Sequence, residues 1–406
     1  MPIHWPTVYA HMDAKLQAWQ AQQEAQRQAL EAARAEMAAW AARPGEAAAL
    51  VQRLLRDHPR LAERYRLAWP LDDRPWDAGH CPDATAGEEC PRPTAMPPGQ
   101  VWAADGSQIT PDRHAAAFFG LVNVGVVHMQ PGHTPAVATH TWLYLEPDFA
   151  AHAGEETAFI AAQRDLYEVE TLADHALHAA AGPRPIVALV DGPLELWRRG
   201  GVEVGKARRR YASALGRMLA GGVLPAGYVD RPRSAPMVHT LALLHAHRQG
   251  RNLDQEDLAA YWPGVADAHL WLGLLRPGQR SPTLRIWTPV PPQGRDQPIP
   301  LAAFYLRLQG QALARVDIPL EAAADPAALD ALHRHLLYQA HIVPGRAYPY
   351  ILLRAHETAL VTYDERRTLE AYLQRRLAEV TGRVRGRSAK QQLKDAVSGG
   401  RRRREG

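Results

Sequence analysis

Apolar residues in the first 65 positions recur at alternating steps of three and four, the spacing of an amphipathic helix. Between residues 16 and 40 this stripe resembles a coiled-coil seam that two glutamines interrupt. Its members are Leu16, Trp19, Gln23, Gln26, Leu30, Ala33, Met37 and Trp40. The pattern predicts a long helix that serves either as a dimer arm or as a helix packed on its own domain.

A second helix is predicted over 45–69, directly after the Pro44-Gly45 break. The stretch that follows is rich in Pro, Gly and Asp, which is typical of a linker. We therefore divide the chain into an N-terminal helical arm, a linker, a β-rich main domain and a tail, with boundaries at 1–69, 70–99, 100–382 and 383–406.

The middle of the chain carries three strand-like runs, a long helical segment, and then alternating strand and helix patterns. The first group covers 100–108, 115–129, 138–147, the helix 154–180, and an apolar strand over 184–197 that suits a buried parallel strand. After these come a helix over 208–219, a strand over 225–232 and a helix from Ser234, then a hairpin of 301–310 with 311–319 and helices over 327–340, 348–362 and 364–379. This order predicts an α/β fold with a mixed sheet flanked by helices, a second β hairpin and C-terminal helices.

Composition limits the class of protein. The 406 residues are 46% hydrophobic and 22% charged, as in soluble globular proteins. No apolar run approaches the roughly 18 residues that span a bilayer, and the first residues lack the basic and apolar regions of a signal peptide. We expect a cytoplasmic protein with no membrane partner.

Charge is unevenly distributed along the chain. The net charge is +4, but the tail over 383–406 holds nine basic and two acidic residues, so the remainder is slightly acidic. We expect this basic tail to be disordered and able to touch phosphates non-specifically, with plain solubility as the alternative.

The two cysteines, Cys81 and Cys90, lie in a loop rich in Pro, Gly and acidic residues. They are too few for a disulfide framework. Together with His80 they offer three zinc-type side chains, but their spacing fits no common zinc site. We expect ordinary loop thiols.

Two predicted strands end in the same dipeptide, Asp-Gly. Asp105 follows "VWAA" and Asp191 follows "IVALV". In an open α/β sheet the carboxyl ends of central strands border the ligand crevice, so these carboxylates are predicted to face each other there. Two close carboxylates repel unless a cation lies between them, and oxygen ligands suit Mg²⁺ or Mn²⁺. The alternative is that each Asp-Gly merely begins a turn.

The helix predicted over 154–180 offers a third acid. Glu170 lies within its apolar stripe, whereas Glu168 shares the opposite face with Arg164. Residues two apart on a helix point roughly 200° apart, so only one of these glutamates can face the sheet. We expect Glu170 to face the two aspartates and Glu168 to be exposed. The stripe consists of Leu166, Val169, Ala173, Ala176 and Leu177.

With these acids the chain resembles the NurA family, nucleases of archaeal and bacterial DNA end resection, over roughly 101–360. The resemblance rests on "DGSQ" at Asp105, "ALVDGPL" at Asp191, "GYVDRPRS" at 227–234 and "YPYILLRAH" at 348–356. The last motif is the most specific. Its Tyr348 and His356 have the spacing at which the family places an active-site tyrosine and histidine.

The resemblance implies an RNase H-like fold, a homodimer, Mn²⁺-dependent DNA cleavage with Mg²⁺ as the other candidate ion, and partnership with the hexameric HerA ATPase. It suggests a 5′–3′ exonuclease with single-strand endonuclease activity that resects double-strand breaks at the nucleoid. In a two-metal mechanism Asp105, Asp191 and Glu170 would hold the ions. His356 would ligate the second metal or position the water, and Tyr348 would donate a hydrogen bond to a phosphate oxygen.

Two arginines in "VDRPRS", Arg231 and Arg233, precede the predicted start of a helix, where phosphate contacts are common. We expect them to bind DNA, with ordinary surface arginines as the alternative. Two other functions stay open for the chain. One is a non-catalytic DNA-binding adaptor on an RNase H-like scaffold, and the other is a junction- or RNA-cleaving relative.

Overall fold

The computed structural model describes residues 3–72, 74–76, 79–84, 88, 90–115, 117–195, 202–288 and 299–381. The predicted basic tail over 383–406 lies outside the described residues. The chain forms two compact units. The first comprises Met1–Pro97, Gly192–Glu195 and Leu224–Pro349, and the second comprises Pro98–Asp191, Leu196–Val223 and Tyr350–Gly406. The division into arm, linker, domain and tail stays a prediction.

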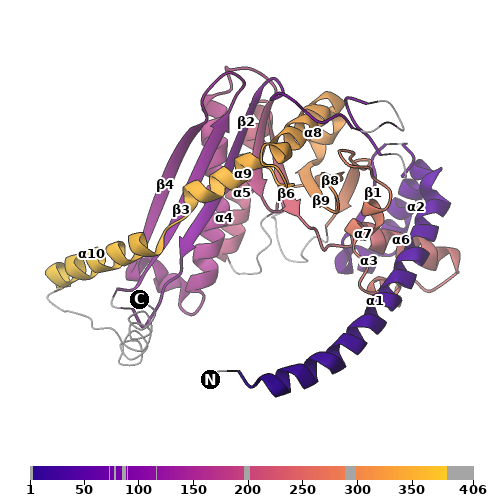
Figure 1. Ribbon diagram of the computed structural model, residues 1–406, viewed down its shortest axis with the longest axis horizontal. Coiled ribbons are helices and arrows are strands. Elements are labelled where there is room, and N and C mark those ends of the chain that lie inside the picture. Colours follow the sequence, from indigo (N-terminus) through magenta and orange to yellow (C-terminus); the bar gives the residue numbers. More distant parts are fainter. Residues whose placement is uncertain are drawn as a thin grey trace. The chain divides into compact units, whose positions relative to one another are not determined.

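The second unit contains an antiparallel meander of three strands, β2 (Gln100–Ile109), β3 (Phe119–Met129) and β4 (Ala136–Leu145). The chain then passes through a 3₁₀ helix, η1 (Glu146–His152), and α4 (Glu156–His178) to β5 (Ile186–Asp191), which pairs in parallel with β2. The resulting order is β5-β2-β3-β4 (Figure 1). A meander followed by a helix and a strand parallel to the first is the RNase H-like arrangement, so the predicted fold class is confirmed.

Helices cover both faces of this sheet. Side chains on a strand alternate between the two faces. In β2, Gly106 lies against α4, while its neighbour Asp105 bonds to His356 of α9 (Tyr350–Ala359). The unit is completed by α5 (Val202–Ala220), which packs on α4, and by α10 (Tyr363–Thr381). β2 therefore lies between two helices that contribute polar side chains to its opposite faces.

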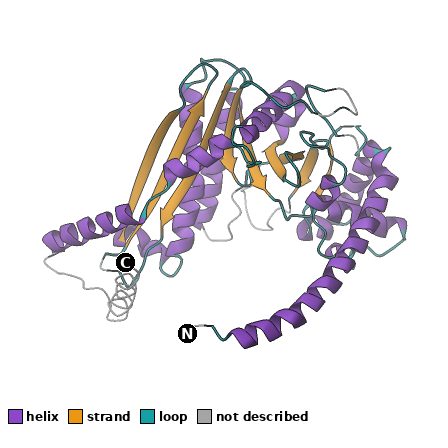
Figure 2. Cartoon of the chain, in the orientation of Figure 1, coloured by secondary structure: helices purple, strands orange, loops and turns teal. Residues whose placement is uncertain are grey.

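The first unit is built on an antiparallel sheet with the order β1-β7-β8-β9-β6. Figure 2 draws the strands of the chain in orange and its helices in purple. Its strands are β1 (Leu67–Pro70), β6 (Val223–Asp230), β7 (Leu284–Trp287), β8 (Leu301–Arg307) and β9 (Leu313–Pro319). Its helices are α1 (Trp5–Ala41), α2 (Pro44–Asp57), α3 (Pro59–Arg64), α6 (Pro236–Arg248), η2 (Leu258–Ala260), α7 (Asp267–Leu272), η3 (Leu320–Ala324) and α8 (Pro326–His341). The predicted late hairpin is present as β8 and β9.

The single helix predicted over 45–69 is wrong. α2 ends at Asp57, and α3 starts at Pro59 after a break at His58. Proline has no amide hydrogen and disfavours a helical conformation in the residue before it, and His58 has a non-helical backbone (φ −127°, ψ 72°). The residues "LAWP" then form β1, buried along its whole length against β7. The apolar end of the predicted helix is thus a buried strand.

The apolar stripe of α1 divides into two halves with different environments. Ala33 and Met37 are buried, and the C-terminal half packs on α6 and α7 of the same unit. Trp5, Met12 and Trp19 of the N-terminal half are exposed. The C-terminal half is therefore packed on its own unit, as one interpretation predicted, and the dimer arm stays a prediction for the exposed N-terminal half. None of the helices in the described part of the chain combines the length and apolar character needed to cross a bilayer.

Cys81 and Cys90 form a disulfide, so the expectation of free loop thiols is wrong. Their Cα atoms are 5.7 Å apart, within the range that a disulfide requires. The loop is held in place because the His80 and Arg280 backbones exchange hydrogen bonds and Arg334 donates to Asp83 at 2.7 Å. Sulfurs bonded to each other are not thiolate ligands, so the alternative zinc site with His80 is also excluded.

A buried carboxylate joins α6 to the sheet of the first unit. Asp267 is fully buried and accepts hydrogen bonds from the Met237 and Val238 amides, at 2.9 and 3.0 Å, and from the Tyr305 hydroxyl at 2.8 Å. Burial raises the pKa of Asp267 from 3.8 to about 6, although these hydrogen bonds oppose the shift. The carboxyl thus binds its proton more tightly in the folded protein than in the unfolded chain.

We expect Asp267→Asn to remove a pH dependence of stability. Because the folded pKa is raised, this group stabilises the fold fully below pH 3.8, and the contribution is lost as pH rises through about 6. Relative to the variant, the natural protein should gain roughly 2 kcal/mol in free energy of unfolding between pH 7.5 and 4.5. Urea titrations of both proteins across this range measure the difference. A difference that does not change with pH would contradict the assignment.

Candidate active site

Asp105 lies within a continuous strand, not at the end of one as predicted, and the alternative that its Asp-Gly begins a turn is also wrong. β2 runs through the Asp-Gly-Ser sequence to Ile109. The glycine is explained by α4, because a Cβ atom at Gly106 would lie 2.5 Å from Oε1 of Glu168 and 2.7 Å from Cγ of Arg164. A glycine within a strand often marks such a close approach. The Asp-Gly sequence here allows a helix carboxylate to reach the strand backbone beside Asp105.

Asp191 does end a strand, as predicted. β5 stops at this residue, and Gly192 follows with φ +115°, in the region that favours glycine. The register pairs Ala104 of β2 with Val190 of β5, so Asp105 and Asp191 come next at the same level on neighbouring parallel strands. Adjacent parallel strands therefore bring the two aspartates to one level of the sheet, and the expectation that their carboxylates face each other stays a prediction.

The assignment of the glutamates to the faces of α4 is wrong. Glu168 is buried beside β2, whereas Glu170 forms two hydrogen bonds, at 2.9 and 2.6 Å, with Arg210 of α5. The reason is that α4 is covered on two sides, by the sheet and by α5. Its apolar stripe therefore does not mark the sheet side alone. Glu168, not Glu170, lies against β2 near the two aspartates.

The surroundings of Glu168 disfavour its negative charge. Burial raises its pKa well above the usual range; Arg164 opposes this shift, and Asp105, Asp165 and Asp191 add to it. Arg164 lies 3.3 Å from Glu168 but is shared with Asp165, at 2.7 Å. Arg164 therefore offsets the charge of Glu168 only in part.

His356 approaches Asp105 from the opposite face of the sheet. Its Nδ1 lies 2.7 Å from Oδ2 of Asp105, whose Oδ1 accepts a hydrogen bond from the Gly106 amide at 2.8 Å. The imidazole is 62% exposed, while the Asp105 carboxylate is 14% exposed. The contact fixes one ring nitrogen of a solvent-accessible histidine and leaves Nε2 available to a substrate or a water molecule.

Three residues that the sequence analysis missed hold α9 in this position. The Ser107 hydroxyl and the Asn123 amide both donate to the carbonyl of Ala359, at 2.5 and 2.8 Å. A Cβ atom at Gly125 would lie 2.6 Å from the Ala359 nitrogen, so only glycine admits the helix there. The available signal was an Asn and a Gly inside the otherwise apolar run "GLVNVGVV".

The other predicted site residues belong to the first unit. Tyr348 lies just before α9, and its half-buried ring packs edge-on against buried Tyr228. Arg231 and Arg233 are exposed after β6, and Arg231 has φ +45°. α6 begins at Pro236, two residues after the predicted Ser234. The roles given to these three side chains stay predictions.

The arrangement brings three carboxylates and an imidazole to one level of β2. Such a group of side chains is able to hold divalent cations through oxygen and to orient a water molecule through nitrogen. Within the described ranges, no three histidine, cysteine or acidic side chains are already gathered into a metal-holding geometry. Ion binding would therefore require the Asp105 and Glu168 side chains to reorient from their present hydrogen bonds and ion pairs.

We expect Asn123→Ala to loosen α9. Asn123 is buried, donates a hydrogen bond to the Ala359 carbonyl and accepts one from the Thr141 hydroxyl at 2.6 Å. The substitution removes both hydrogen bonds, so the Ala359 carbonyl keeps a single side-chain donor. Losses of this kind lower the free energy of unfolding by about 1–3 kcal/mol. Urea unfolding measures the cost, and hydrogen exchange should speed up in 350–359. Thr139→Ala, at an exposed position of β4, is the control; equal effects of the two would contradict the anchoring role.

Comparison with known proteins identifies the family of the chain. The chain is similar to the crystal structure of the NurA nuclease from Sulfolobus solfataricus, with 13% sequence identity and a TM-score of 0.40, over 83% of this chain and 95% of that one. It is also similar to a crystal structure of NurA with manganese, with 13% identity and a TM-score of 0.35, over 70% of this chain and 89% of that one. A third similar structure is the catalytic domain of human endonuclease V, with 14% identity and a TM-score of 0.28, over 69% of this chain and 85% of that one. No curated protein sequence matches significantly. The model of the NurA domain matches residues 99–361, well over half of the sequence, and the chain therefore belongs to the NurA family.

Proposed function

We propose that this NurA-family chain is a metal-dependent deoxyribonuclease whose catalytic residues are Asp105, Glu168, Asp191 and His356. The observation that carries the proposal is the burial of the Glu168 carboxylate against β2, next to two strand aspartates. Burying a carboxylate among other carboxylates costs free energy. An adaptor protein has no need of that cost, whereas a nuclease uses the same charges to hold cations.

The donor set fits a divalent cation of the Mn²⁺ or Mg²⁺ type. Its side chains offer carboxylate oxygens and one imidazole nitrogen, with no thiolate, and carboxylate oxygens suit Mn²⁺ and Mg²⁺. The solved NurA structure with manganese supports the same choice. When bound, two such ions would polarise the scissile phosphate, activate a water molecule and stabilise the leaving oxygen. Asp105, Glu168 and Asp191 would hold them.

The protein's own side chains would supply position and proton handling. Asp105 would be the central ligand, because it lies between the Glu168 side of the sheet and the His356 side. The Asp105–His356 contact would orient the imidazole so that Nε2 accepts a proton from the attacking water or contacts a phosphate oxygen. Arg164 would keep Glu168 in place and limit the repulsion between the carboxylates before ions bind.

The decisive test compares two glutamates on the same helix. We expect Glu168→Gln to reduce Mn²⁺-dependent cleavage of end-labelled DNA by orders of magnitude, because the charge that holds the cation is lost. Glu170→Gln should cost little, since its pair with half-exposed Arg210 contributes at most about 1 kcal/mol. The assay uses single- and double-stranded DNA with Mn²⁺, with Mg²⁺ and with chelator.

A second readout is independent of activity. Mn²⁺ should raise the melting temperature of the natural protein and of Glu170→Gln, and this shift should shrink in Glu168→Gln. Without metal, Glu168→Gln should itself melt higher than the natural protein at neutral pH, because it removes a buried charge. The opposite ranking of the two variants would show that the metal ligand is Glu170. DNA binding without any cleavage would favour the adaptor, and cleavage of RNA alone would favour the RNA-cleaving relative.

We also propose that the chain forms a homodimer through the exposed half of α1. The residues Trp5, Val8, Tyr9, Met12, Leu16 and Trp19 form one apolar stripe along the helix, and each is at least 40% exposed. Part of the stripe lines a shallow groove that also contains His11 and Lys15. A contiguous apolar surface of this kind favours association, and spacings of three and four suit a second copy of the same helix.

Replacing Trp5, Met12 and Trp19 with serine should convert the dimer into a monomer. Light scattering on the natural chain should give about twice 44.9 kDa, and the triple variant should give the single mass. Serine at Leu71 and Leu360, which are exposed outside α1, is the control. A natural chain that is monomeric at micromolar concentration would eliminate the proposal.

We further propose, from the family resemblance, that the nuclease resects DNA ends together with a HerA-type hexameric ATPase. The slightly acidic composition outside the basic tail supports a need for a motor that delivers DNA to the site. The cleavage assay repeated with such an ATPase, with and without ATP, reports on this partnership. Labelling each DNA end in the same assay tests the proposed 5′–3′ polarity and the proposed single-strand endonuclease activity.

A further inference from the structure

Two histidines from different elements meet between β4 and α4. Nε2 of His140 in β4 lies 2.8 Å from Nε2 of His175 in α4, and the two rings stand at 68° to each other. Both side chains are half-buried. At this distance one imidazole donates its proton to the other, so a single hydrogen lies between the two nitrogen atoms. We call these two residues the His pair.

Aromatic side chains surround both rings of the His pair. The Trp102 ring of β2 lies 6.1 Å from the His175 ring, and the Trp142 ring of β4 lies 6.2 Å from the His140 ring. Trp142 also stacks on Tyr167 of α4, with 4.2 Å between the ring centroids. Each imidazole therefore lies beside a bulky neighbour that limits its movement.

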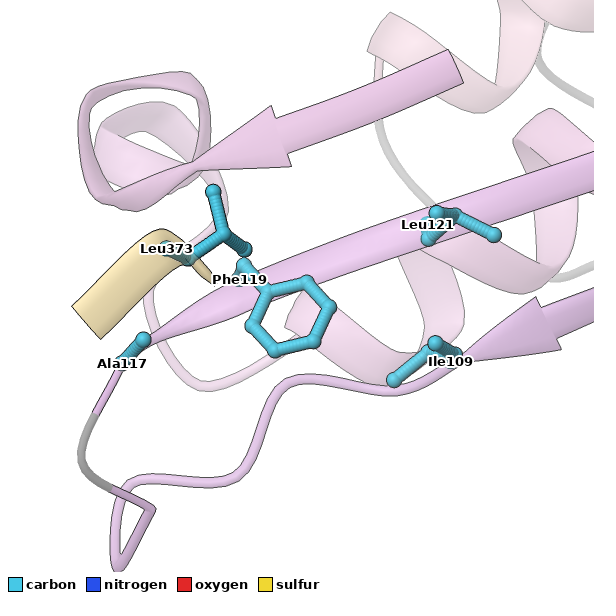
Figure 3. Packing of buried hydrophobic residues seen from close by; sticks show 5 residues of the cluster. All are labelled: Ile109, Ala117, Phe119, Leu121 and Leu373. Atoms are coloured by element: carbon cyan, nitrogen blue, oxygen red, sulfur yellow. The ribbon is translucent and has the colours of Figure 1, made fainter. Parts of the chain in front are cut away.

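The opposite face of the sheet fixes the direction of β4. Leu145 of β4 packs on a buried cluster to which β2, β3 and α10 contribute (Figure 3). The cluster consists of Ile109, Ala117, Phe119, Leu121 and Leu373. Side chains on a strand alternate between the two faces, and His140 and Leu145 are an odd number of residues apart. Packing of Leu145 on one face thus directs His140 to α4 on the other.

The surroundings of the His pair favour neutral imidazoles. His356 faces the carboxylate of Asp105, whereas among the described residues neither ring of the His pair forms an ion pair with a carboxylate. Burial lowers the pKa of His175, and the adjacent His140 lowers it further. A neutral imidazole keeps the nitrogen lone pair that a metal ion requires. The His pair thus offers two such donors from two different elements.

The geometry of the His pair is close to that of two ligands of one ion. Zn–N bonds of 2.0–2.1 Å in a tetrahedral arrangement place two ligating nitrogens roughly 3.3 Å apart. The two Nε2 atoms are 2.8 Å apart, so a separation of about half an ångström more would admit an ion in place of the shared hydrogen. That hydrogen would move to Nδ1 of the donor ring, and both neutral rings would ligate through Nε2.

The His pair is separate from the proposed catalytic residues. The strand register aligns His140 of β4 with Val124 of β3, and Val124 with Gly106 of β2, the glycine that faces Glu168. Two strand spacings of about 4.8 Å place the backbone of His140 roughly 10 Å from that of Gly106. The ligand types also differ, because imidazole suits Zn²⁺, Cu²⁺ and Ni²⁺ whereas carboxylates suit Mg²⁺ and Mn²⁺.

We propose that the His pair binds a divalent transition-metal ion of the Zn²⁺ type, with water molecules in the remaining coordination positions. His140 and His175 ligate the ion through Nε2. The bound ion fastens β4, the strand at the end of the sheet order, to the helix that carries Glu168. This binding is independent of the proposed nuclease function, because it uses none of the proposed catalytic side chains.

Calorimetry measures Zn²⁺ binding to the full chain with excess Mg²⁺ present, which occupies carboxylate sites and competes weakly for imidazole. His140→Gln and His175→Gln should each weaken the binding about tenfold or more. The double variant should bind little worse than either single variant, because one remaining imidazole no longer chelates the ion. His152→Gln is the matched control and should bind normally, since this half-buried imidazole stacks on Phe159 of α4 instead of facing a second histidine.

Two further measurements separate ligation from folding. Zn²⁺ should raise the melting temperature of the natural chain and of His152→Gln, but not of either His-pair variant. NMR of the imidazole nitrogens in the natural chain needs no variant, and the Nε2 signals of His140 and His175 should shift together as Zn²⁺ is added. Unshifted signals, no binding by the natural chain, or equal binding by the His-pair variants would overturn the proposal. So would a loss of binding in His356→Gln alone, which would assign the ion to the proposed catalytic residues.

Discussion

The packing of one buried carboxylate against one strand organises the candidate active site. Glu168 approaches the β2 backbone so closely that only glycine fits at position 106. Asp105, the residue before Gly106, therefore points to the opposite face of the sheet, where it contacts His356. The pleat of a single strand thus combines groups from two helices that do not touch the same face of the sheet.

This contact works against stability and has to be supported by the surrounding structure. Burial raises the pKa of Glu168, and the nearby aspartates increase the effect. Arg164 compensates only in part, because it is shared with Asp165. On the other face, Ser107 and Asn123 hold the end of α9 through a single carbonyl. Strained electrostatics at the centre and strong anchoring around it are the combination expected of a site shaped for function more than for stability.

The same division between anchored and uncommitted surfaces recurs in two helices outside the site. The C-terminal half of α1 is buried on its own unit, while the N-terminal half exposes a tryptophan-containing stripe. α10 is fixed by its leucines and exposes tyrosines and arginines. In both helices one part fixes the direction of the other.

The sequence alone determined the order of the main strands and helices over residues 100–248, because apolar periodicity and turn residues are local properties. It also determined which aspartates come from neighbouring strands, since a parallel pairing of β2 with β5 follows from a strand–helix–strand order. Local motifs with fixed spacing were sufficient to identify the family, which the match over 99–361 confirms.

Only the tertiary structure decided which glutamate faces the strand. An apolar stripe marks a buried side of a helix, but α4 is buried on two sides, and Glu170 lies toward Arg210 of α5. Likewise, the pairing of Cys81 with Cys90 depends on a loop held by Arg280 and Arg334, far away in the sequence. The Asp-Gly of β2 is indistinguishable in sequence from a turn. It lies within a strand because the residues on both sides of it pair with β3, and a glutamate 62 residues after Gly106 occupies the space of the missing side chain.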